Sequence, residues 1–215
     1  MVRWRKERPF DRTEELARAD RARARGRRAR AIAGYRRVLE AQPQDLAVHA
    51  KVAPLLAAAG DRAAALASFV TASEGQLRAG FPDRALSLLA QAARHFPDEE
   101  TLWPEIARLH LQRGRRADAL EALTAGGWDL LRARELALAE RLFRLALEIE
   151  PHDADATALL ARTLARARRK AEAVRLLEEL SQRVRGRRLA AVRWLALRIA
   201  PTPGNGWRWI RALLG

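Results

Sequence analysis

The chain has 215 residues, of which 49% are apolar but only 6% aromatic, and its formal net charge is +15. It contains no cysteine, which excludes disulfides, thiolate metal sites and a cysteine nucleophile. No run of residues approaches the roughly 20 apolar residues that span a bilayer, and residues 1–9 lack the apolar core of a signal peptide. We therefore expect a soluble cytoplasmic protein with one extended domain or two small ones.

Helices are expected along the whole chain. Ala, Leu and Arg dominate and favour helices, whereas strand-forming residues are scarce, so the sequence predicts an all-α fold. A basic flexible arm is expected at 1–11. Helices should follow near 12–25, 28–42, 45–59, 61–79, 82–96, 99–113, 115–133, 136–150, 153–167, 170–184, 188–200 and 207–214. Residues 201–206 should form a turn before the last helix.

Helix-ending residues recur with an alternating spacing. Six residues occupy equivalent positions at helix ends: Gly26, Gly60, Gly80, Gly114, Arg134 and Arg168. The spacings between consecutive ones are 34, 20, 34, 20 and 34 residues. One long and one short spacing together form a super-repeat, which runs from Gly26 to Gly80 and again from Gly80 to Arg134. The segments 61–79 and 115–133 contain no proline-centred loop, so each should be one long helix that closes one hairpin and opens the next. Because glycine weakens helices, Gly126 and Gly127 leave two shorter helices as the alternative for 115–133.

The longer units resemble the tetratricopeptide repeat, which has small residues at positions 8, 20 and 27, glycine at 15, a large apolar residue at 24 and proline at 32. Residues 12–45 fill these positions with Ala19, Ala31, Val38, Gly26, Tyr35 and Pro43, and residues 66–99 fill them with Ser73, Ala85, Ala92, Gly80, Leu89 and Pro97. Degenerate repeats cover roughly residues 12–187. The resemblance implies a right-handed solenoid of helical hairpins, with the position-20 alanines buried at helix contacts: Ala31, Ala85, Ala119, Ala139 and Ala173.

No group of residues has the spacing of a catalytic or metal site. The four histidines are scattered, and none lies three or four residues from another: His49, His95, His110 and His152. We therefore expect no enzymatic activity, no metal and no cofactor. The resemblance implies instead a scaffold that binds a protein partner in the concave groove of the solenoid.

Basic residues occupy positions that form the concave face in tetratricopeptide proteins: Arg23, Arg108, Arg162 and Arg166, with Lys51 nearby. Arginine binds carboxylate and phosphate groups through paired hydrogen bonds, so the expected partner is an acidic protein segment. A solvated charged surface is the alternative for each of these residues.

The two ends of the chain carry the excess positive charge. Residues 1–40 hold 14 basic and 6 acidic side chains, and residues 162–215 hold 14 and 3. In 188–215 we expect capping helices that cover the end of the solenoid, with Trp194, Trp207 and Ile210 largely shielded. The alternative is a contact with an anionic membrane surface or nucleic acid, made by Arg187, Arg188, Trp207, Arg208, Trp209 and Arg211. Codon bias of a GC-rich genome is another source of arginine.

Overall fold

A computed structural model describes residues 10–214, without the side chain of Leu214. Every regular element in this range is an α-helix, which confirms the all-α prediction. Contacts divide the chain into two compact units, Met1–His95 (unit 1) and Phe96–Gly215 (unit 2). Residues 1–9 of the expected arm lie outside the described range.

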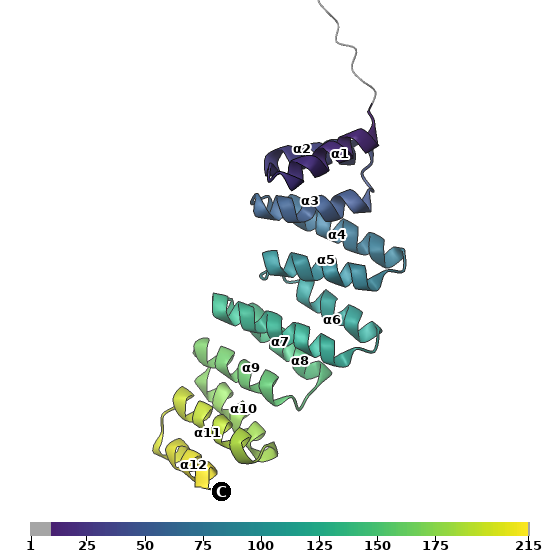
Figure 1. The fold of residues 1–215 in the computed structure, drawn as a ribbon. Helices are drawn as coiled ribbons and strands as arrows, with labels where there is room; N and C mark the ends of the chain where they lie inside the picture. Colours follow the sequence, from purple (N-terminus) through teal and green to yellow (C-terminus); the bar gives the residue numbers. More distant parts are fainter. Residues whose placement is uncertain (1–9, 215) are drawn as a thin grey trace, which may run out of the picture. The chain divides into compact units, whose positions relative to one another are not determined.

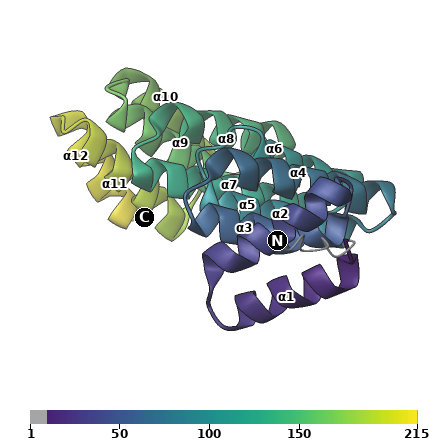
Figure 2. The same ribbon diagram turned by 90° about the horizontal axis from the view of Figure 1, so that it is seen from above.

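Unit 1 is built from helical hairpins (Figure 1). Its helices in the described range are α1 (Arg12–Ala24), α2 (Arg28–Ala41), α3 (Leu46–Ala58), α4 (Arg62–Arg78) and α5 (Pro82–His95). Each packs against the next, and α3 also contacts α5, so that α4 serves two hairpins. The α1–α2 hairpin is drawn in purple in Figure 2.

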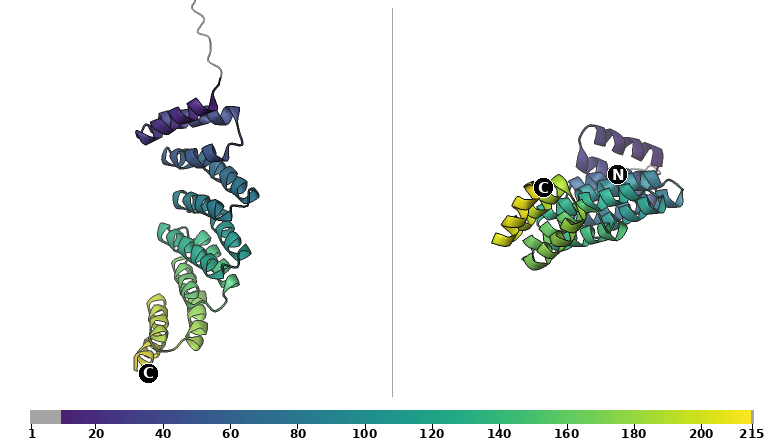
Figure 3. Two further views of the ribbon diagram at one scale, coloured as in Figure 1. Left: turned by 45° about the vertical axis from the view of Figure 1, so that its right-hand side comes forward. Right: turned by 90° about the horizontal axis from the view of Figure 1, so that it is seen from below.

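Unit 2 continues the same construction. Its helices are α6 (Leu102–Gln112), α7 (Arg116–Ala133), α8 (Leu136–Ile149), α9 (Ala154–Arg166), α10 (Lys170–Arg183), α11 (Gly186–Ile199) and α12 (Pro203–Leu214). Besides the contacts between neighbours in the chain, α6 contacts α8, α7 contacts α9, and α9 contacts α11. The helices α7, α9 and α11 therefore lie in a row, which can be followed in Figure 3.

The residues of the alternating spacing all adopt the left-handed conformation. Their φ angles lie between 67° and 83°, in the order Gly26, Gly60, Gly80, Gly114, Arg134 and Arg168. The turn after α7 shows the bonding: the amide of Glu135 donates to the carbonyl of Leu130 at 2.9 Å, and Arg134 donates to Leu131 at 3.3 Å. These bonds satisfy carbonyls at the helix end. The predicted helix ends, and with them the super-repeat, are confirmed.

Both long helices are continuous, as the spacing predicts: α4 runs over 17 residues and α7 over 18. The alternative of two short helices in 115–133 is wrong, because both glycines lie inside α7 and are buried. A Cβ atom at Gly126 would lie 2.4 Å from the Trp103 ring, and one at Gly127 would lie 2.7 Å from the Phe143 ring. These glycines provide room for neighbouring rings.

Small residues pack at the hairpin contacts. The position-20 alanines are completely buried, as predicted: Ala31, Ala85, Ala119, Ala139 and Ala173. The large side chains at position 24 are also buried: Tyr35 has no exposed surface and Leu89 is 4% exposed. The local register of the repeats is therefore confirmed in both units.

The C-terminal helices differ from prediction in two ways. First, α12 begins at Pro203, so Gly204, Asn205 and Gly206 are helical and the expected turn at 201–206 is wrong. The hydroxyl of Thr202 accepts a hydrogen bond from the Asn205 amide at 3.2 Å, and Pro203 starts the helix. A threonine cap followed by proline is a helix-start signal.

Second, the expected shielding of three apolar side chains is wrong: Trp194 is 41% exposed, Trp207 62% and Ile210 42%. The physical reason is that, among the described residues, α11 places apolar side chains in the core of unit 2 and α12 does not. In α11, four side chains are buried in the core of unit 2: Val192, Leu195, Ala196 and Ile199. In the described part of α12, only Asn205 is buried.

Candidate functional site

The row of helices α7, α9 and α11 encloses a hollow of about 330 Å³, which we call the α7/α9/α11 groove. Each helix contributes side chains to it. The lining residues are Trp128 and Leu131 from α7, Arg162, Ala165 and Arg166 from α9, and Leu195, Arg198 and Ile199 from α11. No acidic side chain is among them.

The groove combines an apolar floor with an aromatic wall. Leu131, Leu195 and Ile199 are buried and form the floor, whereas Trp128 is 40% exposed. An aromatic side chain presented to solvent beside buried aliphatic groups can receive an apolar side chain of a partner.

Three arginines from two helices surround this floor. One nitrogen of Arg166, Nη1, donates to the carbonyl of Leu131 at 2.8 Å, near the negative end of α7. The Arg198 guanidinium lies 4.7 Å from the centroid of the Trp194 ring. Arg162 is exposed and makes no ion pair within residues 10–214. The groove therefore presents guanidinium donors without neutralising carboxylates, which suits an anionic ligand.

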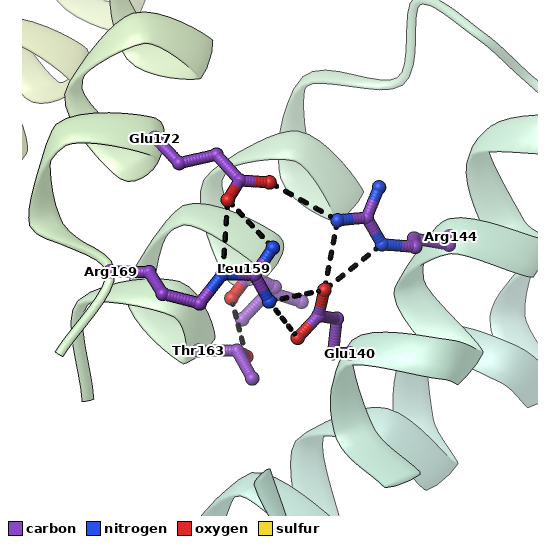
Figure 4. A network of polar contacts seen from close by, with 6 residues as sticks. All are labelled: Glu140, Arg144, Leu159, Thr163, Arg169 and Glu172. Carbon is purple, nitrogen blue, oxygen red and sulfur yellow. Dashed lines mark hydrogen bonds and ion pairs between the residues drawn. The ribbon is translucent and has the colours of Figure 1, made fainter. Parts of the chain in front are cut away.

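A polar network on α8 and α10 links the hairpins of unit 2 (Figure 4). Arg144 donates to Glu140 at 2.8 Å and to Glu172 at 3.2 Å, and Arg169 donates to the same two carboxylates at 2.8 and 2.6 Å. Burial acts to raise the pKa of Glu140, but the hydrogen bonds from Arg144 and Arg169 outweigh it, so its pKa lies below the ordinary 4.5. The network thus links α8 of one hairpin to the start of α10 in the next.

The other predicted concave-face residues are not brought into this groove. In unit 1, Lys51 Nζ donates to Asp20 Oδ2 at 2.8 Å, and the Tyr35 hydroxyl donates to Oδ1 at 2.6 Å. Burial acts to raise the pKa of Asp20, but these two hydrogen bonds lower it below the ordinary 3.8. Lys51 is therefore committed to an internal contact, and Arg23 lies exposed on α1 nearby.

Arg108 belongs to a different surface of unit 2. Its Nε donates to Glu105 Oε2 at 2.7 Å, and this hydrogen bond raises the pKa of Arg108. Arg108 borders a second hollow of about 560 Å³ between α6, α7 and α8, where Leu111 and Leu145 contribute apolar surface. Its charge is already compensated by a neighbour on the same helix.

A cluster of arginines lies between α1 and α2, around a hollow of about 330 Å³: Arg18, Arg21, Arg25, Arg27, Arg30 and Arg37. Glu15 pairs with Arg18 at 3.0 Å and with Arg37 at 2.8 Å. The basic composition of 1–40 indicated positive charge here but did not single out these residues.

The C-terminal candidates are dispersed over α11 and α12. Arg187 and Arg188 are exposed at the start of α11, and Trp209 is half-buried. Arg208 and Arg211 border a further hollow beside Trp207. Only some of the predicted C-terminal residues therefore share one surface.

Two residues of the α7/α9/α11 groove were missed as candidate site residues. Trp128 follows the glycine pair that leaves a helix break as an alternative, and Arg198 is not among the predicted contact residues of the C-terminal segment. The signal that could have found them is the row of helices itself: once α7, α9 and α11 are taken as first helices of successive hairpins, both residues fall on one face.

Residues 10–214 contain no cluster of histidine and carboxylate side chains that could hold a metal ion. Within the same range, no helix has both the length and the apolar character needed to cross a bilayer.

Several solved structures are similar to this chain over most of its length. The protein pilF of Pseudomonas aeruginosa is 16% identical, with a TM-score of 0.40 and coverage of 94% of this chain and 89% of that one. PilW, a type IV pilus biogenesis factor, is 17% identical, with a TM-score of 0.39 and coverage of 94% and 90%. A putative kinesin light chain from Podosopora anserina is 16% identical, with a TM-score of 0.41 and coverage of 94% and 91%. Similarity at this level carries no information on function.

No curated protein matches the sequence. Residues 130–193 match the family model described as Tetratricopeptide repeat. This region includes all of α8, α9 and α10 and the first half of α11, with the left-handed turns at Arg134 and Arg168 and the buried Ala139 and Ala173. Residues 130–193 are therefore similar to the tetratricopeptide repeat family.

Proposed function

We propose that the chain is a scaffold that binds an acidic segment of a protein partner in the α7/α9/α11 groove. Proteins built from tetratricopeptide repeats are generally scaffolds for protein–protein interaction. The observation that carries the proposal is the set of three guanidinium groups around an apolar floor, with no acidic side chain in the lining.

The groove suits a segment in which acidic and aliphatic residues alternate. Carboxylates of the partner would accept hydrogen bonds from Arg162 and Arg198, both exposed to solvent. Arg166 uses Nη1 for the Leu131 carbonyl and retains its other donors for the partner. Aliphatic side chains would rest on Leu195 and Ile199 beside Trp128. Charge would then steer the encounter, and burial of apolar surface would hold the complex.

The experiment is fluorescence anisotropy of a labelled peptide in which glutamate alternates with leucine, titrated with the full chain. Arg162→Glu should weaken binding at least about tenfold, because a hydrogen bond to a charged group contributes about 1.5–3 kcal/mol. A peptide with serine in place of leucine should also bind more weakly, since it loses the contact with the floor.

Arg175→Glu is the matched control. Arg175 is exposed on α10 and does not line the groove, so this variant changes the net charge equally. The proposal is wrong if the two variants lose the same affinity, since the binding would then follow net charge. It is equally wrong if the wild-type chain does not bind the peptide.

A further inference from the structure

An apolar stripe runs along the solvent side of α12. Three large side chains spaced three residues apart are strongly exposed: Trp207 at 62%, Ile210 at 42% and Leu213 at 57%. At 100° per residue they fall within one third of the helix circumference. Scattered exposed apolar residues are ordinary, but a continuous row of them marks a contact surface.

A cationic hollow of about 320 Å³ lies directly beside this stripe. It is bordered by Leu189 and Arg193 from α11 and by Trp207, Arg208, Arg211 and Ala212 from α12. Trp207 belongs to both features, so the apolar and cationic surfaces are continuous.

Two of the three arginines at the hollow keep donors for a ligand. Arg208 is paired with Glu178 of α10 at 2.5 Å. The Arg211 guanidinium lies 5.9 Å from the centroid of the Trp207 ring. In Arg193 the Nε atom is shielded from solvent and has no hydrogen-bond partner among the described residues. A shielded donor of this kind gains most from an anionic acceptor.

We propose that α12 and this hollow form a binding site for an anionic phospholipid surface. The stripe would enter the boundary between headgroups and acyl chains, while Arg193 and Arg211 bind lipid phosphates. A helix with an apolar face and arginine at its flank binds membranes in this manner, and tryptophan favours that boundary. At 12 residues the helix is about 18 Å long, shorter than the ~30 Å core, so it lies along the surface.

Lipid fits the stripe better than nucleic acid does. Binding of single strands relies on aromatic rings that stack on bases, and only one of the three exposed side chains is aromatic. Ile210 and Leu213 are aliphatic and are stabilised by contact with acyl chains. Arg193 and Arg211, which border the hollow beside the stripe, supply the attraction to anionic headgroups.

The test is co-sedimentation of the full chain with vesicles of phosphatidylcholine, with and without phosphatidylglycerol. We expect binding to the vesicles with phosphatidylglycerol and little to the neutral ones. The double substitution Trp207→Ser and Leu213→Ser should weaken binding at least about tenfold, since two large apolar side chains no longer enter the lipid. Arg211→Gln should weaken it about fivefold, because each arginine near an anionic surface contributes about 1 kcal/mol.

Two controls are matched to these variants. Leu111→Ser removes an apolar side chain of similar exposure, 43%, from α6, and Arg175→Gln removes one charge from α10. Both should bind vesicles as the wild type does. Circular dichroism should show the same helix content in all variants, since the altered side chains are exposed.

Several results would overturn the lipid site. The wild-type chain could fail to sediment with phosphatidylglycerol vesicles, or the double variant could bind them like its Leu111→Ser control. Binding of a single-stranded oligonucleotide that the double variant loses, without vesicle binding, would instead assign the surface to nucleic acid. Arg162→Glu should leave vesicle binding unchanged, so this test is separate from that of the peptide groove.

Discussion

The long helices α4 and α7 each belong to two hairpins of their unit, but they make room for neighbouring side chains in different ways. Each is shared by two hairpins and contains glycine where a neighbour approaches. In α4, Gly75 makes room for one aliphatic side chain, Leu46 of α3. In α7, Gly126 and Gly127 make room for Trp103 of α6 and the ring of Phe143 of α8. A helix shared by two hairpins can therefore make room for a side chain of one neighbouring helix or of both.

The two helices also differ at their ends: α4 has a side-chain cap and a glycine in the turn that follows it, and α7 has neither. The carboxylate of Asp61 caps α4 by accepting from the Ala64 amide at 3.3 Å, and the turn after α4 uses Gly80. The residue before α7 is Arg115, whose side chain makes no capping bond, and the turn after α7 uses Arg134. The ends of α4 are therefore stabilised by a side-chain cap and a glycine turn, whereas α7 depends on packing along its middle.

The largest effect should come from filling the space that α7 leaves for an aromatic ring. Gly127→Ala places a Cβ 2.7 Å from Phe143, a ring with no exposed surface. We expect a loss of about 2–3 kcal/mol in the free energy of unfolding. Gly75→Ala should stay within about 1 kcal/mol of wild type, because Leu46 is half-buried and can rotate, and alanine favours helix. Urea unfolding of both variants measures this, and equal losses would abolish the distinction.

The position-20 contacts should behave alike beside both shared helices. Ala85 on α5 and Ala139 on α8 are completely buried and occupy equivalent positions in successive super-repeats. Replacing either by leucine should overpack the contact and cost about 1–3 kcal/mol. Thermal melts of the two variants should shift downward by similar amounts. A melting temperature unchanged from wild type in either one would contradict the close approach at that hairpin.

The turns after the two helices should respond with opposite signs. Arg134 holds φ at 68°, a conformation that costs a residue with a Cβ roughly 1–2 kcal/mol, so Arg134→Gly should stabilise the protein by about 1 kcal/mol. Gly80→Ala should destabilise it by a similar amount, since φ is 79° there. If Arg134→Gly melts lower than wild type, the arginine side chain must contribute more than its backbone costs.

The smallest effect concerns the stability of the protein at acidic pH, and we expect both units to lose stability as the pH falls. Glu140 in unit 2 and Asp20 in unit 1 both have a pKa below the ordinary value. The stability they contribute is complete above that ordinary value and is lost as pH falls through the lowered pKa. Glu140→Gln should flatten the fall in the free energy of unfolding between neutral pH and about pH 3, by less than about 1 kcal/mol, as measured by urea unfolding at each pH. A curve as steep as that of wild type would show that Arg144 and Arg169 do not stabilise the charged carboxylate.

Much of the fold could be predicted from the sequence because the relevant signals are local. Left-handed turns need glycine or tolerate a strained residue, and the fixed spacing revealed Arg134 and Arg168 even without glycine. Small residues at hairpin contacts follow the same periodicity. Helix propensity alone left a helix break at Gly126 and Gly127 as an alternative. Packing nevertheless requires both glycines within α7, because neighbouring rings approach them closely.

The candidate site was harder to predict because it depends on contacts between distant segments. Arg162 and Arg166 lie on one helix, so their common face follows from spacing. Their neighbours Trp128 and Arg198 come from α7 and α11, and only the row of helices brings all four together. Similarly, Lys51 could be placed on α3, but its pairing with Asp20 of α1 is a tertiary contact that positions in a repeat do not show.

The shared helices also limit how a gene of this kind can gain or lose repeats. In a regular array, any single repeat can be duplicated without changing the neighbours of the others. Here a loss of residues 81–114 would remove α5 and α6 and set two shared helices in succession. Only a segment such as 61–114, one complete super-repeat, preserves the alternation of left-handed turns. Copy number in related genes is therefore expected to change by whole super-repeats, each carrying one shared helix together with the two helices that follow it.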